Sequence, residues 1–298
     1  MSLGGQTPFH SAAVEAEDLS PLWLGHYSLR HIGLGERWQV AAAAGFTGIS
    51  VAWTELLEMR AAGVTATKLK DRASSLGLQL TQLEYFPLAT PHSPGVAQEL
   101  ATDMAQTAAE LGCTCVTTVG NAAEGFVDPL PDDVPIGNQI IDNFGVLCDA
   151  CDTVGIGCGV EFMPFVTAID TLSRAVELLR AVDRPNAGLI IDALHFFRSG
   201  PDWSGLRDVA PGDIHTVQLC DGLAQSRPGP YIMESLFGRT CPGEGEFDLY
   251  RFISTLRAFD APFTVEVLSD ELNNLPALDS SRRMADSTRA FLAAAANL

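Results

Sequence analysis

Short apolar runs alternate with longer amphipathic stretches along most of the chain, and this alternation limits the possible folds more than any other feature. Eight of the runs have the length and composition of buried β-strands. They span Leu22–Tyr27, Gly48–Ala52, Gln79–Tyr85, Cys113–Val119, Cys158–Met163, Gly188–Asp192, Ile214–Leu219 and Phe263–Val267. Because strands that alternate with helices form parallel sheets, the pattern predicts an α/β protein.

Stretches with helical periodicity separate these strands. They span Gly35–Ala44, Thr65–Leu76, Gly95–Leu111, Ile136–Val154, Thr171–Val182, Trp203–Val209, Asp248–Phe259 and Asp279–Ala295. Asp170 or Thr171 is expected to cap one helix at its N-terminus, and Asp279 the last helix. Glycines that would end a helix precede several strands, namely Gly45, Gly77, Gly112 and either Gly155 or Gly157.

Eight strands with intervening helices favour a closed (β/α)8 TIM barrel over an open sheet. An open doubly wound sheet would normally have a glycine-rich phosphate loop after its first strand. Here the first strand instead runs into His26-Tyr27-Ser28-Leu29-Arg30. No linker or low-complexity segment interrupts the middle of the chain. We therefore expect a single TIM-barrel catalytic domain over residues 19–298, and a leader or disordered N-terminus over residues 1–18.

The composition excludes several classes of partner. The chain carries 18 basic and 37 acidic residues, a net charge of −19, whereas nucleic-acid binding needs clustered Lys and Arg. No run of about 18 apolar residues is present, so no membrane span is predicted. The seven cysteines include a C-x-x-C at Cys148 and Cys151 within a predicted helix, which is typical of reduced cysteines in a cytoplasmic protein. Similar barrels are often dimers, so a homodimer is a candidate assembly.

Four of the later strands each carry one polar side chain near their end. These are Glu161, Asp192, Gln218 and Glu266, each within an otherwise apolar segment. In such barrels the chemistry lies at the C-terminal ends of the strands. Any one of the four could be a satisfied structural group, but an unpaired buried carboxylate costs several kcal/mol. Four on successive strands favour a hard cation with oxygen ligands, such as Mg²⁺ or Mn²⁺.

Other polar residues near the strand ends are candidates for substrate contacts. His195 follows Asp192 by three residues and could be a ligand, a substrate contact or a capping residue. The remaining candidates are Arg198, His26, Glu84 and Arg239, of which Arg239 could equally lie at the surface. Three aromatic residues near strand ends could form an apolar wall or belong to the core: Trp53, Phe86 and Phe162. Few basic residues lie near the loops, which disfavours a phosphorylated substrate.

Together these residues resemble the xylose isomerase-like TIM barrels, a superfamily of sugar isomerases and epimerases, inosose dehydratase, hydroxypyruvate isomerase, 3-dehydroshikimate dehydratase and endonuclease IV. The resemblance covers roughly residues 20 to 295. It is carried by Val160-Glu161, Asp192-x-x-His195, Val217-Gln218-Leu219-Cys220-Asp221, Pro242-Gly243-Glu244-Gly245 and Val265-Glu266. The resemblance implies that Glu161, Asp192, Gln218 and Glu266 hold one divalent metal ion, with Mn²⁺ or Mg²⁺ favoured over Co²⁺ or Zn²⁺.

The chain departs from the family pattern at two positions. Many members carry His where this chain has Gln218, although some that are similar to dehydroshikimate dehydratases carry Gln. The dehydratases tend to carry His two residues after the glutamate of the fifth strand, where this chain has Met163. Endonuclease IV uses more His ligands and three zinc ions. This chain has only six His and is strongly acidic, so endonuclease activity is not expected.

The resemblance implies an enzyme that isomerises or epimerises a small sugar or related hydroxy-ketone. Glu161 and Glu266 would be the catalytic pair, one removing and one returning a proton next to the carbonyl. One alternative is a metal-dependent dehydratase that acts on inosose or 3-dehydroshikimate. A lesser alternative is a non-catalytic barrel that binds a metabolite. Solvent hydrogen exchange, release of water, and binding without exchange distinguish the three.

Overall fold

The computed structural model describes residues 21–91, 93–122, 125–226, 228–256, 260 and 262–296. Its eight strands are all parallel and pair in chain order, and the last strand pairs with the first to close the barrel. They are β1 (Trp23–Leu24), β2 (Gly48–Ala52), β3 (Gln79–Pro87), β4 (Cys115–Val119), β5 (Gly157–Glu161), β6 (Ala187–Asp192), β7 (Ile214–Leu219) and β8 (Thr264–Val265). The predicted (β/α)8 fold is therefore confirmed.

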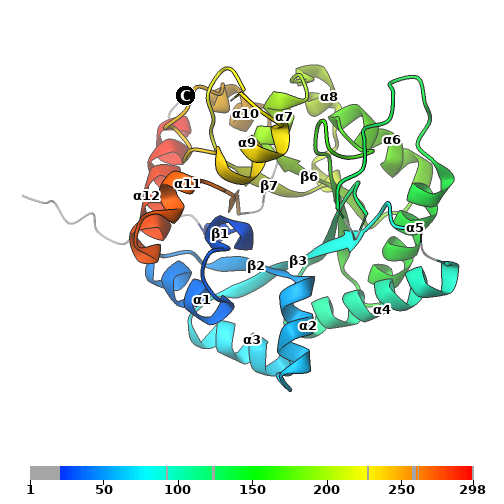
Figure 1. Ribbon diagram of the computed structural model, residues 1–298, viewed down its shortest axis with the longest axis horizontal. Coiled ribbons are helices and arrows are strands. Elements are labelled where there is room, and N and C mark those ends of the chain that lie inside the picture. Colours follow the sequence, from blue (N-terminus) through cyan, green and yellow to red (C-terminus); the bar gives the residue numbers. More distant parts are fainter. Residues whose placement is uncertain are drawn as a thin grey trace, which may run out of the picture.

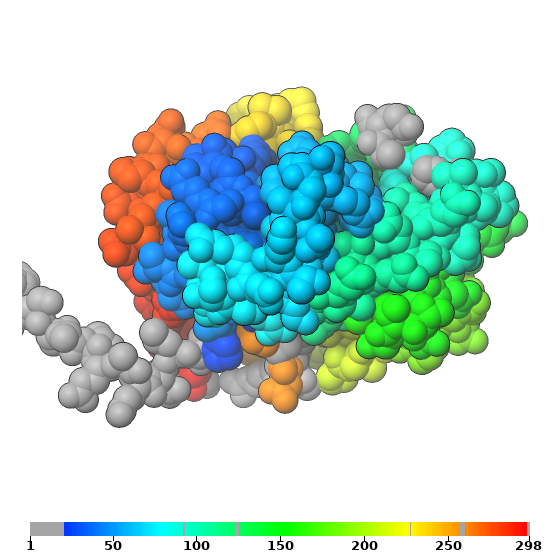
Figure 2. All heavy atoms as spheres, turned by 90° about the horizontal axis from the view of Figure 1, so that it is seen from below, coloured from blue at the N-terminus to red at the C-terminus, as the bar shows by residue number. Residues whose placement is uncertain are grey.

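Helices form a ring around these strands, and α12 closes it by packing against α1 (Figure 1). The helices are α1 (Leu34–Ala43), α2 (Trp53–Ala61), α3 (Ala66–Ser75), α4 (Pro94–Leu111), α5 (Asn138–Asp152), α6 (Leu172–Val182), α7 (Ala193–Arg198), α8 (Trp203–Asp208), α9 (Tyr231–Phe237), α10 (Leu249–Thr255), α11 (Asp270–Asn273) and α12 (Ala277–Ala295), with 3-10 turns η1 (His26–Leu29) and η2 (Pro211–Asp213). Figure 2 looks onto the flank where the blue and cyan atoms of α1–α3 lie side by side.

Three strands end earlier at the barrel mouth than predicted, and β3 ends two residues later, at Pro87. The first strand contains only Trp23–Leu24, and His26 begins a 3-10 turn instead of continuing the strand. The fifth strand ends at Glu161 and the eighth at Val265, each two residues earlier than predicted. Apolar residues continue past these strands because the loops are also buried against the barrel, so hydrophobicity alone cannot mark the strand ends.

The predicted helix ends are correct where the backbone geometry is distinctive. Gly45, Gly77, Gly112 and Gly155 all have positive φ, between 72° and 83°, as expected of residues that end helices. The predicted end of one helix, at residue 259, lies outside the described residues.

Of the predicted N-caps, Thr171 caps α6, and its side chain accepts a hydrogen bond from the amide of Arg174 at 3.2 Å. Asp279 is not a cap. The last helix begins at Ala277 after Pro276, which places Asp279 inside the first turn.

The core of the protein is one cluster of buried apolar side chains. Trp53, Phe86 and Phe162 all belong to this core, so the alternative that they form the wall of a binding site is not supported. All seven cysteines are buried, and Cys148 and Cys151 lie on α5 as predicted. Among the described residues, no helix is both long and apolar enough to cross a bilayer.

Candidate active site

The four polar residues expected at the strand ends converge at one end of the barrel. Glu161 and Asp192 are the last residues of β5 and β6, Gln218 is the penultimate residue of β7, and Glu266 directly follows β8. Asp192 is aligned with Gln218 across neighbouring strands. All four side chains are buried, with at most 2% of each residue exposed. Parallel register therefore brings three carboxyl groups and one amide together inside the protein.

Arg239 joins two of these carboxylates. Its Nη1 donates to Asp192 Oδ2 at 2.7 Å and to Glu266 Oε2 at 3.1 Å, while its Nε donates to the carbonyl oxygen of Ser235 at 2.9 Å. The alternative that Arg239 is a surface residue is wrong, because only 2% of it is exposed. A buried guanidinium needs such carboxylate partners to offset its desolvation, and it fixes their orientation in return.

His195 lies beside Glu161 and Asp192. The side chain of Asp192 caps α7 and accepts a hydrogen bond from the His195 amide at 3.0 Å. The ring places Nε2 3.2 Å from Glu161 Oε1, and its Nδ1 hydrogen-bonds the hydroxyl of Tyr231 on α9. One ligand atom from each of Glu161, Asp192 and His195 lies within 4.8 Å of the other two, a grouping that could hold a metal ion.

Three oxygen atoms of the cluster have no hydrogen-bond donor among the residues that the structure describes. They are Glu161 Oε2, Gln218 Oε1 and Glu266 Oε1, all buried from solvent. Buried acceptors are normally hydrogen-bonded, so three unsatisfied oxygens at the ends of β5, β7 and β8 need an explanation. A hard divalent cation prefers such carboxylate and amide oxygens. The donor set therefore fits a metal ion of this kind.

Burial and neighbouring charges shift the pKa values of the acidic groups in opposite directions. Burial raises the pKa of Glu161 well above its usual value, and the charge of Asp192 adds to this effect. The pKa of Glu266 is raised for the same main reason. Burial also opposes ionisation of Asp192, but the charges of Arg239 and His195 and the hydrogen bonds from both residues together outweigh it, so the pKa of Asp192 is lowered. Burial lowers the pKa of His195 to about 4, which leaves its ring neutral at neutral pH.

A cavity of about 300 Å³ opens onto these groups. Its polar lining includes Glu161, Glu266, His195 and Arg239 from the cluster, together with Arg30, Asn121 and Ser235. Its apolar lining includes Tyr27, Tyr85, Val119, Phe126, Met163, Leu236 and Leu268. Asp192 and Gln218 are not lining residues. The two glutamates therefore face a space that could hold a small molecule.

Two of the expected substrate contacts lie elsewhere in the barrel. His26 and Glu84 form a buried pair, with His26 Nδ1 3.2 Å from Glu84 Oε2 and 3.1 Å from Ser50 Oγ. Gln82 donates to Glu84 Oε1 at 2.7 Å. Neither His26 nor Glu84 lines the cavity, although both are directly followed by tyrosines that do. The pair is therefore buried beside lining residues without lining the cavity itself.

Arg198 is also displaced from the expected role. Its Nη2 donates to Glu234 Oε1 at 2.7 Å and to the carbonyl oxygen of Leu223 at 2.7 Å, and its guanidinium lies 4.9 Å from the centroid of the Phe247 ring. It does not line the cavity. Through these bonds Arg198, the last residue of α7, holds both α9 and the loop that follows β7. A direct contact between Arg198 and the substrate is therefore not supported.

Sequence reasoning missed several lining residues. Tyr27 and Arg30 lie in the turn after β1, and Tyr85 lies in β3, directly after Glu84. Ser235 and Leu236 come from α9, a helix inserted after β7. The position of Tyr27 and Arg30 near the end of the first strand could have identified them as candidate lining residues. Nothing local to α9 indicates that it reaches the cavity.

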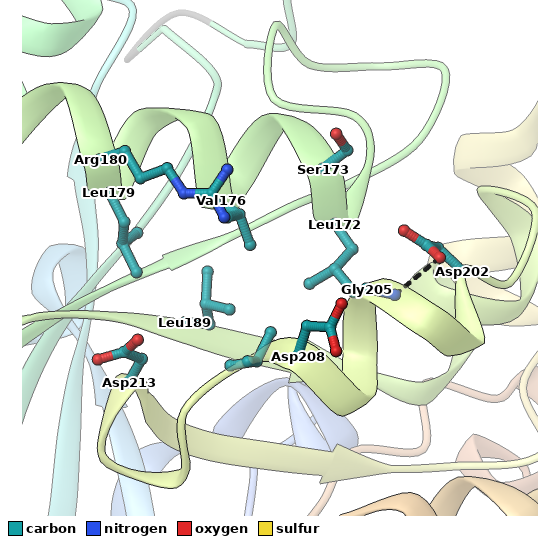
Figure 3. A pocket seen from close by; sticks show the side chains of 11 residues that line it. Leu172, Ser173, Val176, Leu179, Arg180, Leu189, Asp202, Gly205, Asp208 and Asp213 are labelled. Carbon is teal, nitrogen blue, oxygen red and sulfur yellow. Dashed lines mark hydrogen bonds between the residues drawn. The ribbon is translucent and has the colours of Figure 1, made fainter.

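A second cavity, of about 240 Å³, lies outside the barrel between α6 and α8 (Figure 3). Leu172, Leu179 and Leu189 contribute apolar side chains to it, and Asp208 and Asp213 contribute carboxylates. It shares no lining residue with the cavity at the strand ends. The cluster of carboxyl and amide groups at the barrel mouth is therefore separate from this outer cavity.

Comparison with known proteins supports this assignment of the fold. A sequence profile described as xylose isomerase-like TIM barrel matches residues 38–292. A 3-dehydroshikimate dehydratase of Pseudomonas putida is 26% identical over 269 residues, which cover 87% of this chain and 39% of the relative. An inosose isomerase of Bacillus licheniformis is 26% identical over 189 residues, which cover 62% of this chain and 65% of the relative. The chain thus spans less than two-thirds of the length of either relative.

A solved structure described as the IOLI protein with a binding zinc atom has the same fold. Its TM-score is 0.77 at 18% identity, and the match covers 92% of this chain and 99% of that one.

Proposed function

The chain belongs to the xylose isomerase-like TIM-barrel family, and from this premise we propose that it is a divalent-metal-dependent isomerase or epimerase of a small hydroxy-ketone. The observation that carries the proposal is the pair of buried glutamates, Glu161 and Glu266, facing one cavity from different strands. Its curated relatives include an isomerase and a dehydratase, so enzymes of both reaction types occur among proteins similar to this chain.

Glu161, Asp192, Gln218 and Glu266 would hold the metal ion, and His195 is a further candidate ligand. Three unsatisfied oxygens and the grouping of Glu161, Asp192 and His195 support this assignment. When bound, a divalent metal would act as a Lewis acid toward the carbonyl and adjacent hydroxyl oxygens of the substrate. The IOLI structure described with a zinc atom shares the fold. We favour Mn²⁺ or Mg²⁺ from the oxygen-rich donor set, with Co²⁺ or Zn²⁺ as alternatives.

The chain's own residues would carry the proton transfers. One of Glu161 and Glu266 removes the proton from the carbon next to the carbonyl, and the other, protonated, returns a proton. Return to the opposite face of the same carbon gives an epimer. Return to the neighbouring carbon, with transfer of the hydroxyl proton to the former carbonyl oxygen, gives an isomer. Arg239 holds Glu266 and Asp192 in place through its Nη1. It also lines the cavity, so a contact with the substrate remains part of the proposal.

Dehydration is the second candidate, because the dehydratase relative matches 87% of this chain. Met163 weighs against it. This residue lines the cavity at the position where the dehydratases are expected to carry His. A thioether neither donates nor takes up a proton, so Met163 cannot assist the departure of a hydroxyl group.

Hydrogen exchange in D₂O would test the proposal. The Mn²⁺-loaded protein would be incubated with D-fructose, scyllo-inosose and 3-dehydroshikimate, and the products followed by NMR and mass spectrometry. We expect one of these ketones to exchange the hydrogen next to its carbonyl without a change in molecular formula. Release of water with a new ultraviolet absorption would instead establish the dehydratase. Binding of a ketone without hydrogen exchange would indicate a non-catalytic barrel that binds a metabolite.

Glu266→Gln should reduce the exchange rate by about 10²–10⁴-fold, the usual effect of removing a general acid or base. The fold should be retained, because the replacement has the same shape. Glu58→Gln is the matched control, since Glu58 is exposed on α2, away from the cavity. Unchanged exchange in Glu266→Gln would remove Glu266 from the acid–base role.

A further inference from the structure

Arg30 lines the same cavity from the turn after β1. Its side chain is partly buried, and its Nη2 donates to the carbonyl oxygen of Leu236 at 2.8 Å. Its guanidinium carbon lies 4.6 Å from the centroid of the Phe237 ring. Leu236 and Phe237 end α9, so these contacts hold the guanidinium between the first turn and the inserted helix, at the edge of the cavity.

Within the described part of the chain, the charge of Arg30 has no close counterion. No carboxylate of the described residues lies within 4.0 Å of it, whereas Arg239 contacts both Asp192 and Glu266. Asp270 acts on Arg30 only from a longer distance, and burial lowers the pKa of Arg30 despite this attraction. The guanidinium is nevertheless protonated at neutral pH. An unpaired, partly desolvated guanidinium at the edge of a cavity attracts an anion.

The other walls of the cavity suit a carbon skeleton. Tyr27 and Tyr85 lie with their rings nearly parallel, at 17°, and with centroids 6.0 Å apart. Leu236 and Phe126 add further apolar surface. The volume of about 300 Å³ is at the lower end of the range for ligand pockets, which indicates a small molecule. The net charge of −19 does not oppose an anion here, because exposed charges farther away than about 8 Å are largely screened at physiological salt.

We propose that the cavity accepts a hydroxy-ketone that carries one carboxylate, and that Arg30 is the specificity-determining residue that binds this group. The hydroxy-ketone part of this proposal rests on the function proposed above, and the carboxylate part is inferred from Arg30. A carboxylate fits better than a phosphate, which proteins commonly hold with a glycine-rich loop at a helix N-terminus. One amino group of Arg30 is already bonded to Leu236, and among the described lining residues it has no second unpaired cation beside it.

Binding of unreactive polyols would test this proposal independently of turnover. Isothermal titration calorimetry of the Mn²⁺-loaded protein would compare quinate, a cyclic polyol carboxylate, with myo-inositol, its neutral counterpart, and with myo-inositol 1-phosphate. We expect quinate to bind at least about tenfold more tightly than myo-inositol, as for one charge-assisted hydrogen-bonded pair. Arg30→Gln should weaken quinate binding by about tenfold and leave myo-inositol unchanged.

Two variants serve as controls. Arg30→Lys keeps the charge and should retain part of the preference for quinate. Arg207→Gln removes the same charge from an exposed position on α8 and should behave as the wild type. The proposal is overturned if quinate does not bind, if its affinity is unchanged in Arg30→Gln, or if the phosphate binds more tightly. The binding experiment and the hydrogen-exchange experiment can fail independently. Quinate binding that depends on Arg30, without any hydrogen exchange, would refute only the proposed reaction.

Discussion

At the scale of single residues, the position of the Glu266 side chain depends on a glycine that directly follows β1. Gly25 follows β1, and its amide donates to the carbonyl oxygen of Val265 at 2.8 Å. A Cβ atom added to Gly25 would lie 3.0 Å from Glu266 Oε1 and 3.1 Å from Glu266 Cγ. These contacts are too close to be accommodated without movement. The absence of a side chain at Gly25 therefore leaves the space that the Glu266 carboxylate occupies.

Gly25→Ala should displace the Glu266 carboxylate and lower kcat at least tenfold, because small misplacements of a catalytic group have large effects on rate. The φ of −69° at Gly25 is compatible with alanine, so the free energy of unfolding should change little. Steady-state kinetics and thermal unfolding would measure both effects. Gly35→Ala is the matched control, since an added Cβ there meets nothing within 4 Å. An unaltered kcat in Gly25→Ala would show that the Glu266 position does not depend on this space.

At the scale of elements, strands and inserted segments have different roles in the site. Four strand ends supply the cluster of carboxylates and amide, whereas α9 supplies Tyr231 and Ser235, the partners of His195 and Arg239. Arg198 and Glu234 hold this helix against α7 through an ion pair of 2.7 Å. The strands therefore place the reactive groups, and the segment after β7 orients them.

The two predicted helix caps make a direct comparison possible. Thr171→Ala removes the side-chain acceptor of the Arg174 amide, and such a loss costs about 1 kcal/mol of stability. Asp279→Ala should lower the stability by only about 0.3 kcal/mol, because Asp279 lies within the first turn of α12 and contributes through the helix dipole. Urea unfolding followed by circular dichroism would give both values. Equal losses would mean that Asp279 acts as a cap after all.

At the scale of the whole molecule, closure of the barrel forces acidic groups together. Each of the strands β5 to β8 is held by its neighbours on both sides, so the backbone positions that carry Glu161, Asp192 and Glu266 cannot move apart without breaking the sheet. Arg239 alone does not neutralise three carboxyl groups. The folded state therefore carries electrostatic repulsion or bound protons at the barrel mouth unless a cation is bound there.

Metal binding should consequently stabilise the fold. We expect about one equivalent of Mn²⁺ per chain by elemental analysis, and a higher Tm when Mn²⁺ is added, since a ligand at 100 times its Kd stabilises by about 2.7 kcal/mol. Glu161→Ala/Asp192→Ala should lose both effects, and the milder Glu161→Gln should weaken them. Asp208→Ala/Asp213→Ala removes two carboxylates from the outer cavity and should retain both (Figure 3). A wild type that binds no Mn²⁺ would refute the four-ligand site.

The sequence by itself determined the number and order of the strands and the polar residues at their ends. Both are local signals: a strand inside a barrel is a short apolar run, and Glu161, Asp192, Gln218 and Glu266 each interrupt such a run. Because parallel strands place their C-terminal ends at the same end of a barrel, convergence of the four could also be predicted from the fold class. The structure brings them together as expected.

The tertiary structure alone decided which of the other candidates reach the cavity. Arg239 meets a partner 47 residues away, and Arg198 meets Glu234 36 residues away, so neither pairing has a local signature. Whether His26 or its neighbour Tyr27 faces the cavity depends on a 3-10 turn that replaces the end of the predicted strand. These outcomes depend on the relative positions of loops fixed by long-range packing, which hydrophobic periodicity does not encode.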